Sequence, residues 1–167
     1  MIPSRRNFIF VGVAGAAALA TVRLWPREAP RPGALGADGV AVMSAIAPVM
    51  LAGALPGGGA RETALNETLV AIESAVAGLA PRAQAELGDL FALLALAPAR
   101  WSLAGMTASW QSATPADVAR FLDRLRESRI ELLRAAYDAL HQLVMAAWYG
   151  NPRAWPAIGY GGPPVLG

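Results

Sequence analysis

An apolar series with a period near 3.6 residues fills the C-terminal third of the chain and restricts that part to helix. Its members are Val118, Phe121, Leu122, Leu125, Leu132, Leu133, Ala136, Tyr137, Leu140, Leu143, Val144 and Trp148. This spacing places apolar side chains along one face of an α-helix. Thr114 is a favourable N-cap, Pro115 suits the first turn, and Asp117 lies near the positive end of the helix dipole. The sequence therefore predicts one long amphipathic helix over residues 114–148.

The apolar series is interrupted in its middle by Ser128 and Arg129. An arginine that faces a core must extend its charge to water or find hydrogen-bond acceptors, because an unpaired buried charge is very costly. Arg129 is therefore expected either to snorkel or pair within the chain, or to contact a partner protein. On the opposite face, charged residues such as Arg134 and Asp138 are expected to form weak i to i+4 pairs on a solvated surface.

Shorter helices are expected upstream of residue 99. Residues 61–78 carry apolar side chains on one side and acids on the other, and Pro81 suits the first turn of a helix that stops near Pro98. These two helices are predicted to form an antiparallel pair. Residues 38–55 are another helix candidate, and they contain Pro48. Their lack of charge leaves two alternatives, a buried core helix, which Pro48 and the glycines favour, or a membrane span.

Residues 99–113 lack periodicity and carry Trp101 and Trp110. We expect a loop here, and its two tryptophans require burial either in the chain's own core or in a partner. Together with the helices on either side, the predicted fold class is all-α. The expected architecture is a small helical bundle with one long C-terminal helix and an irregular aromatic tail, preceded by a signal segment and a linker.

The N-terminus resembles an export signal of the twin-arginine type. Arg5 and Arg6 precede Phe8 and an uncharged run to residue 22, with small residues at 16–20 that suit a cleavage site. The expected division is a signal segment at 1–22, a proline-rich linker at 23–36, and a helical domain at 37–167 whose tail is 149–167. An uncleaved anchor is the alternative, although the run is shorter than the ~20 apolar residues of a membrane span.

The composition excludes several classes of site. The chain has no cysteine, so disulfides, thiolate-ligated metals and covalently attached c-type haem are excluded. Its single histidine, His141, cannot by itself form a multi-histidine metal site, and no nucleophile elbow accompanies it. The net charge is only +2, with the arginines interleaved with acids, which argues against a nucleic-acid surface. We therefore expect no enzyme, no catalytic, cofactor-binding or metal-binding residue, and no nucleic-acid partner.

The tail combines helix-breaking residues with aromatic side chains. From residue 148 it reads WYGNPRAWPAIGYGGPP. Its glycines and prolines end the helix and force a turned or extended backbone. Tryptophan and tyrosine are the residue types that enrich interface hot spots. The tail is therefore expected either to bind a partner protein or to fold back as a lid on its own bundle.

This tail resembles the C-terminal Y-x-N-P-x-x-W-x-x-I-G-Y-x-G-P region of the gluconate 2-dehydrogenase subunit 3 family. The twin-arginine head and the position of the long helix agree with that family, whereas residues 61–113 match it only in helical style. Its members are small, Tat-exported accessory subunits of flavin-dependent sugar and alcohol dehydrogenases. The resemblance implies a noncatalytic subunit that binds, stabilises and co-exports a catalytic chain.

The resemblance also implies partners and a location. The partners are a large FAD-containing catalytic subunit of the GMC oxidoreductase type, often a separate c-type cytochrome, and the Tat translocon. FAD belongs to the catalytic subunit, so no cofactor is expected in this chain. The implied location is the periplasm, with membrane association through the partner complex or an uncleaved signal. The residues expected to bind the partner are Trp148, Tyr149, Asn151, Pro152, Trp155, Ile158, Gly159, Tyr160 and Arg129.

Two other functions remain open on the sequence. One is a stand-alone exported helical binding module whose tail covers its own bundle. The other is a small membrane-anchored helical protein that uses its two uncharged segments as spans.

Overall fold

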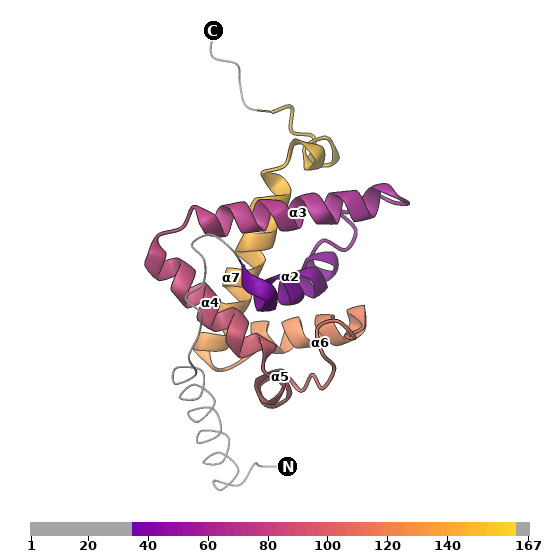
Figure 1. The fold of residues 1–167 in the computed structure, drawn as a ribbon. Helices are drawn as coiled ribbons and strands as arrows, with labels where there is room; N and C mark the ends of the chain where they lie inside the picture. The colour runs from indigo at the N-terminus through magenta and orange to yellow at the C-terminus, as the bar shows by residue number, and fades with distance from the viewer. Residues whose placement is uncertain (1–34, 163–167) are drawn as a thin grey trace, which may run out of the picture.

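A computed structural model of the chain describes residues 35–162, which form helices and connecting turns without a strand among them (Figure 1). The predicted all-α class is confirmed. The predicted signal segment, with Arg5, Arg6 and Phe8, and nearly all of the linker lie outside the described residues. The elements are α2 (Gly36–Met50), α3 (Ala60–Ala77), α4 (Pro81–Ala95), α5 (Ala97–Ala104), α6 (Pro115–Arg126), α7 (Glu131–Tyr149) and the 3₁₀ turns η1 (Pro152–Ala154) and η2 (Pro156–Ile158).

Helix α2 is the centre of the bundle. It lies between α3 and α6 in Figure 1 and contacts α3, α4, α6 and α7. Val42, Met43 and Ile46 are fully buried on it. Gly39 permits the close packing of α4, because a Cβ there would lie only 3.1 Å from the ring of Phe91. The uncharged segment is therefore a core helix, although it ends at Met50 rather than at residue 55.

No helix within residues 35–162 is long and apolar enough to cross a membrane. This finding includes α2, for which the sequence left a membrane span open. Of the two alternatives for this segment, the core helix remains, which Pro48 in the last turn of α2 favoured.

The single helix predicted over residues 114–148 is wrong, because the structure has two helices there. The first, α6, begins with the expected N-cap at Thr114, and the structure adds a capping box in which Thr114 and Asp117 exchange hydrogen bonds. The chain leaves helical geometry after Arg126, and α7 starts at residue 131. The Ser128 hydroxyl accepts a hydrogen bond from the Ile130 amide at 3.1 Å, so it offers the backbone an alternative to the helical ladder.

The break changes the side chains around it. Arg129 lies in the connection at residues 127–130 and is exposed, so the expected problem of a buried charge does not arise. Leu132, which the periodicity placed in the core, is 64% exposed. The Arg134 guanidinium donates to the Ser128 carbonyl oxygen at 2.7 Å and braces the connection, in place of the expected pair with Asp138.

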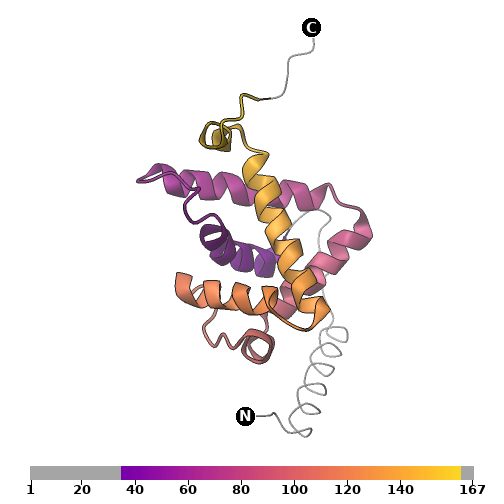
Figure 2. The same ribbon diagram turned by 180° about the vertical axis from the view of Figure 1, so that it is seen from behind.

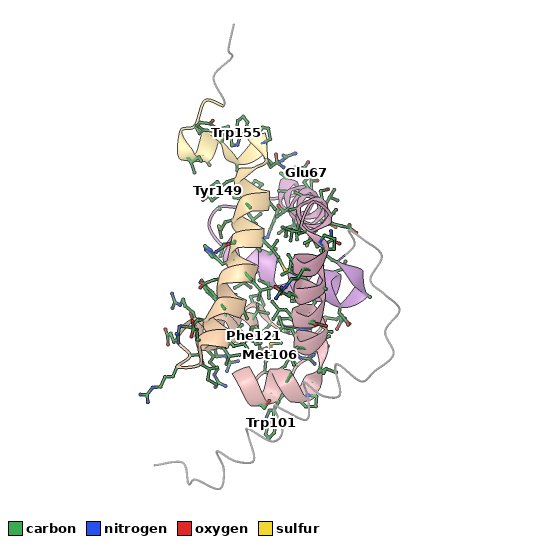
Figure 3. All side chains as sticks on the ribbon, turned by 90° about the vertical axis from the view of Figure 1, so that its left-hand side faces the viewer. Glu67, Trp101, Met106, Phe121, Tyr149 and Trp155 are labelled. Carbon is green, nitrogen blue, oxygen red and sulfur yellow. The ribbon has the colours of Figure 1, made fainter. Side chains whose placement is uncertain are left out.

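The segment predicted as a loop over residues 99–113 begins inside helix α5, and it separates its two tryptophans. Trp110 is buried, stacks edge-to-face on Phe121 with ring centroids 5.1 Å apart, and donates to the Leu94 carbonyl oxygen at 2.8 Å. Trp101 is 66% exposed and points away from the bundle at the end far from Trp155 (Figure 3). The chain's own core therefore accounts for one tryptophan and not for the other.

Candidate functional site

The tail begins at the C-terminal end of α7, and Trp148 anchors that end in the hydrophobic core. Trp148 is only 3% exposed and belongs to the hydrophobic core, whereas the next residue, Tyr149, is 43% exposed. Successive helical side chains point about 100° apart, so one residue separates the buried face from the exposed face. Of the residues predicted to bind a partner, Trp148 is thus a core residue that offers no surface.

Two consecutive 3₁₀ turns give the tail a defined shape. The Asn151 side-chain oxygen accepts from the Arg153 amide at 2.9 Å and caps the first turn, which Pro152 opens. Gly159 ends the second turn with a φ of +70°, a conformation that glycine adopts without strain. The chain then turns back, and the Tyr160 amide donates to the Trp155 carbonyl oxygen at 3.0 Å. Asn151, Pro152 and Gly159 therefore have structural roles within the tail.

A carboxylate on α3 holds the tail to the bundle. Glu67 accepts from Arg153 Nε at 2.9 Å and from Arg153 Nη2 at 2.8 Å, in a bidentate pair. Asn151 Nδ2 donates to the same carboxylate at 3.2 Å. Beneath this group, Ala154 is buried against the bundle. We call Glu67, Asn151 and Arg153 the tail clamp; Figure 3 shows Glu67 facing the base of the tail.

The clamp shifts the ionisation of its members. Hydrogen bonds from Arg153, and then from Asn151, hold the pKa of Glu67 below its ordinary value of 4.5. The same hydrogen bond raises the pKa of Arg153. Because the pKa of Glu67 is lowered in the folded chain, its ionised form contributes fully to stability above pH 4.5. This contribution is lost as the pH falls through the lowered pKa.

We expect the Glu67→Gln variant to be cleaved by trypsin after Arg153 several-fold faster than the wild-type chain. The neutral amide loses the charge-assisted part of the clamp, so the tail opens more often. Cleavage after Arg82, which is exposed and remote from the tail, is the internal reference in the same digest. Equal cleavage after Arg153 in both chains would show that the clamp does not hold the tail.

The same clamp predicts a pH response in the wild-type chain. As the pH falls below 4.5 and through the lowered pKa of Glu67, the NMR signal of the Trp155 indole N–H should shift, since the tail loosens once the carboxyl is protonated. That signal should stay unchanged over this range in the Glu67→Gln variant, which has no carboxyl to titrate at the clamp.

Several tail side chains outside the clamp expose apolar surface. Trp155 donates from its indole nitrogen to the Tyr149 carbonyl oxygen at 2.9 Å, and its ring meets Tyr160 edge-on with centroids 5.3 Å apart. Ile158 is 54% exposed and Tyr160 is 48% exposed. We call Tyr149, Trp155, Ile158 and Tyr160 the tail platform. The tail is thus fixed to its own bundle by the clamp and also presents a preformed aromatic surface.

Within residues 35–162, no three His, Asp or Glu side chains are grouped so that they could hold a metal ion. His141 is half-buried on α7, with its ring stacked on Tyr137 at 5.8 Å. A groove of about 730 Å³ between α2 and the start of α6 is lined without a charged residue, with Val40, Pro48 and Trp110 among its walls. Such a lining provides no group for acid or base chemistry.

The tail clamp was missed by the sequence reasoning. Glu67 was assigned to the polar face of its helix, and Arg153 was not singled out within the tail. The two residues are 86 positions apart in the chain, and no local pattern connects an acid on one helix with an arginine in a distant turn. Only the packing of α7 against α3 brings them together.

The resemblance to the gluconate 2-dehydrogenase subunit 3 family rests on the residues of this chain alone. Of the tail residues that carry it, Asn151 belongs to the clamp, and Tyr149, Trp155, Ile158 and Tyr160 form the platform. Among known proteins, no protein-family model, no curated protein and no solved structure matches this chain.

Proposed function

We propose that this chain is a noncatalytic accessory subunit that binds, stabilises and co-exports the FAD-dependent catalytic subunit of a periplasmic dehydrogenase complex. The observation that carries the proposal is the tail platform. Tyr149, Ile158 and Tyr160 are each more than two-fifths exposed, on a segment whose backbone is fixed by the tail clamp. A surface that is ordered before binding loses less conformational entropy on association.

The composition of the platform supports a protein partner. Aromatic side chains with one polar atom provide large apolar area and a hydrogen-bonding group, and they dominate the energetics of protein interfaces. The tail's resemblance to the gluconate 2-dehydrogenase subunit 3 family gives the class of partner, a GMC-type flavoprotein with a c-type cytochrome often joined to it. The twin arginines, Arg5 and Arg6, support Tat export of the assembled pair.

We expect an affinity-tagged wild-type chain, isolated from the periplasm of its native source, to bring with it a flavoprotein that absorbs near 450 nm. The Ile158→Asp variant should recover about tenfold less flavin, because the complex would then bury an unpaired carboxylate in its interface, which is costly. Flavin absorbance per mole of tagged chain is the measurement.

The matched control is Val70→Asp, since Val70 is a similarly exposed aliphatic residue on α3, at 63%. Equal flavin recovery with Ile158→Asp and with Val70→Asp would exclude the platform as the binding surface. A wild-type chain that purifies alone as a folded monomer would instead favour a stand-alone binding module.

A further inference from the structure

The exposed side of helix α7 has a charged half and an uncharged half. Figure 2 shows α7 running along the outside of one face of the bundle, across α3, α2 and α6. Its buried face is formed by Leu133, Ala136, Leu140, Val144, Ala147 and Trp148. On the opposite side, the charged residues Glu131, Arg134 and Asp138 occupy only one half of the surface.

The other half is a line of uncharged residues over the whole length of the helix. Their spacing alternates between three and four residues, which places them in one row that winds slowly around the helix. The row consists of Leu132, Ala135, Ala139, Gln142, Ala146 and Tyr149. Ala139 is half-buried and the others are exposed, with Leu132 at 64%. We call these six residues the α7 stripe.

The α7 stripe has the shape that suits a second helix. Alternate three- and four-residue spacing is the pattern by which two helices pack along a common seam. The alanines in its middle let a second helix approach closely, toward the lower end of the usual 8–10 Å between axes. Leu132 and Tyr149 form raised ends, so an occupying helix is held between two larger side chains.

The charged residues beside the α7 stripe indicate which charge its occupant should carry. Glu131 and Asp138 lie about two helical turns apart along one edge of the stripe. The nearest arginine on the helix, Arg134, donates to the Ser128 carbonyl oxygen instead. Neither carboxylate forms an ion pair within residues 35–162. A helix with Lys or Arg along the facing edge would satisfy both.

A second copy of α7 does not meet this requirement. In an antiparallel pair of α7 helices the two acidic edges face each other, so like charges approach. In a parallel pair the acidic edge faces Ala136, Leu143 and Gly150, which carry no positive charge. The occupant is therefore a helix of different sequence.

We propose that the α7 stripe receives an α-helix of the catalytic subunit, with large apolar side chains on its buried face and basic residues along the edge that faces Glu131 and Asp138. The inference rests on the proposed function for the identity of the partner. Tyr149 belongs both to the stripe and to the tail platform, so one partner can cover both surfaces without a gap.

The size of the α7 stripe explains why it acts together with the tail platform. A strip about 26 Å long and 10 Å wide covers about 260 Å². A stable interface buries roughly 800 Å² on each partner. The stripe alone is thus too small to hold a free peptide firmly, and the experiment requires the whole partner.

The test is the recovery of flavoprotein with the tagged full chain from the periplasm of the native source. Ala135→Arg places a long charged side chain in the α7 stripe, and Ala75→Arg places the same side chain at an exposed alanine of α3. We expect flavin recovery to fall about tenfold with Ala135→Arg and to stay at the wild-type level with Ala75→Arg. Matching thermal midpoints of the two variants would confirm that both are folded.

A photocrosslinking residue placed at position 146 identifies the occupant. We expect it to crosslink to one segment of the flavoprotein, and mass spectrometry of the crosslinked peptide should show a helical apolar pattern with Lys or Arg along one edge. The same residue at position 75 should give no such product. A crosslink to a second copy of this chain, or to a flavoprotein segment without that pattern, would overturn the inference.

The outcomes separate the two proposals. Normal recovery with Ala135→Arg, together with lost recovery for Ile158→Asp, would overturn the role of the α7 stripe and leave the accessory function standing. If the wild-type chain recovers no flavoprotein at all, both proposals fall.

Discussion

We expect the Trp148→Ala variant to lose about 3–5 kcal/mol of its free energy of unfolding, as large-to-small changes of a buried aromatic residue do. Trp148 is buried at the end of α7, within the core that α2 and α3 share with that helix. Removing the indole leaves a cavity that rigid helices fill only in part. Equilibrium unfolding in urea, followed by circular dichroism, measures the loss.

Trp101→Ala is the matched control, since the same side chain is removed from a site that is 66% exposed. Its free energy of unfolding should stay within about 0.5 kcal/mol of the wild-type value, as is usual for surface substitutions. Equal losses for the two variants would contradict the assignment of Trp148 to the core. The pair also matters for binding experiments, because reduced partner recovery by Trp148→Ala would reflect a weakened fold rather than a lost contact.

Hydrophobic periodicity was sufficient to predict the helical class and most of the helices. Glu62 and Glu73 on one side of α3 and Ile72 and Val76 on the other are a local pattern, and the structure places them as expected. Pro81 likewise begins α4 as the rule for first helical turns predicts. Such features depend only on residues within one or two helical turns of each other, so they can be predicted directly from the sequence.

The break between α6 and α7 could not be predicted from hydrophobic periodicity. Leu132 continues the apolar period across the break, so counting periods predicts one helix. The structure ends α6 because side chains bond to the backbone instead. Ser128 accepts from the Ile130 amide, and Arg134 donates to the Ser128 carbonyl oxygen. These hydrogen bonds compete with the backbone hydrogen bonds of a continuous helix. The spacing of apolar residues does not show which set is the more stable.

The candidate site was predictable in composition and not in orientation. The sequence identified the aromatic tail, and it left open whether the tail covers its own bundle or a partner. The structure shows both kinds of residue in the tail, since Glu67 holds Arg153 and Asn151 while Ile158 and Tyr160 are exposed. That division depends on which face of α7 is buried, and thus on the tertiary packing of α7 against α3.

Arg100 is the second residue whose replacement should have a large effect. It is 6% exposed, and its guanidinium donates to the carbonyl oxygens of Leu94, Ala95 and Ala108. Two of these acceptors are at the C-terminal end of α4, where the helix dipole favours a positive charge. Burial lowers the pKa of Arg100, yet an arginine remains protonated at any pH at which the chain is folded. The guanidinium therefore ties α4 to α5 and to the connection before α6.

We expect Arg100→Met to lower the free energy of unfolding by about 3 kcal/mol, because hydrogen bonds to a charged group contribute about 1.5–3 kcal/mol each and are not additive. Arg100→Lys should recover only part of this, since one ammonium cannot reach acceptors on both α4 and the connection. Arg82→Met is the control, because the Arg82 side chain is 91% exposed and its pair with Glu86 contributes under about 1 kcal/mol. If urea unfolding gives equal stabilities for Arg100→Met and Arg82→Met, the buried guanidinium does not join α4 to α5.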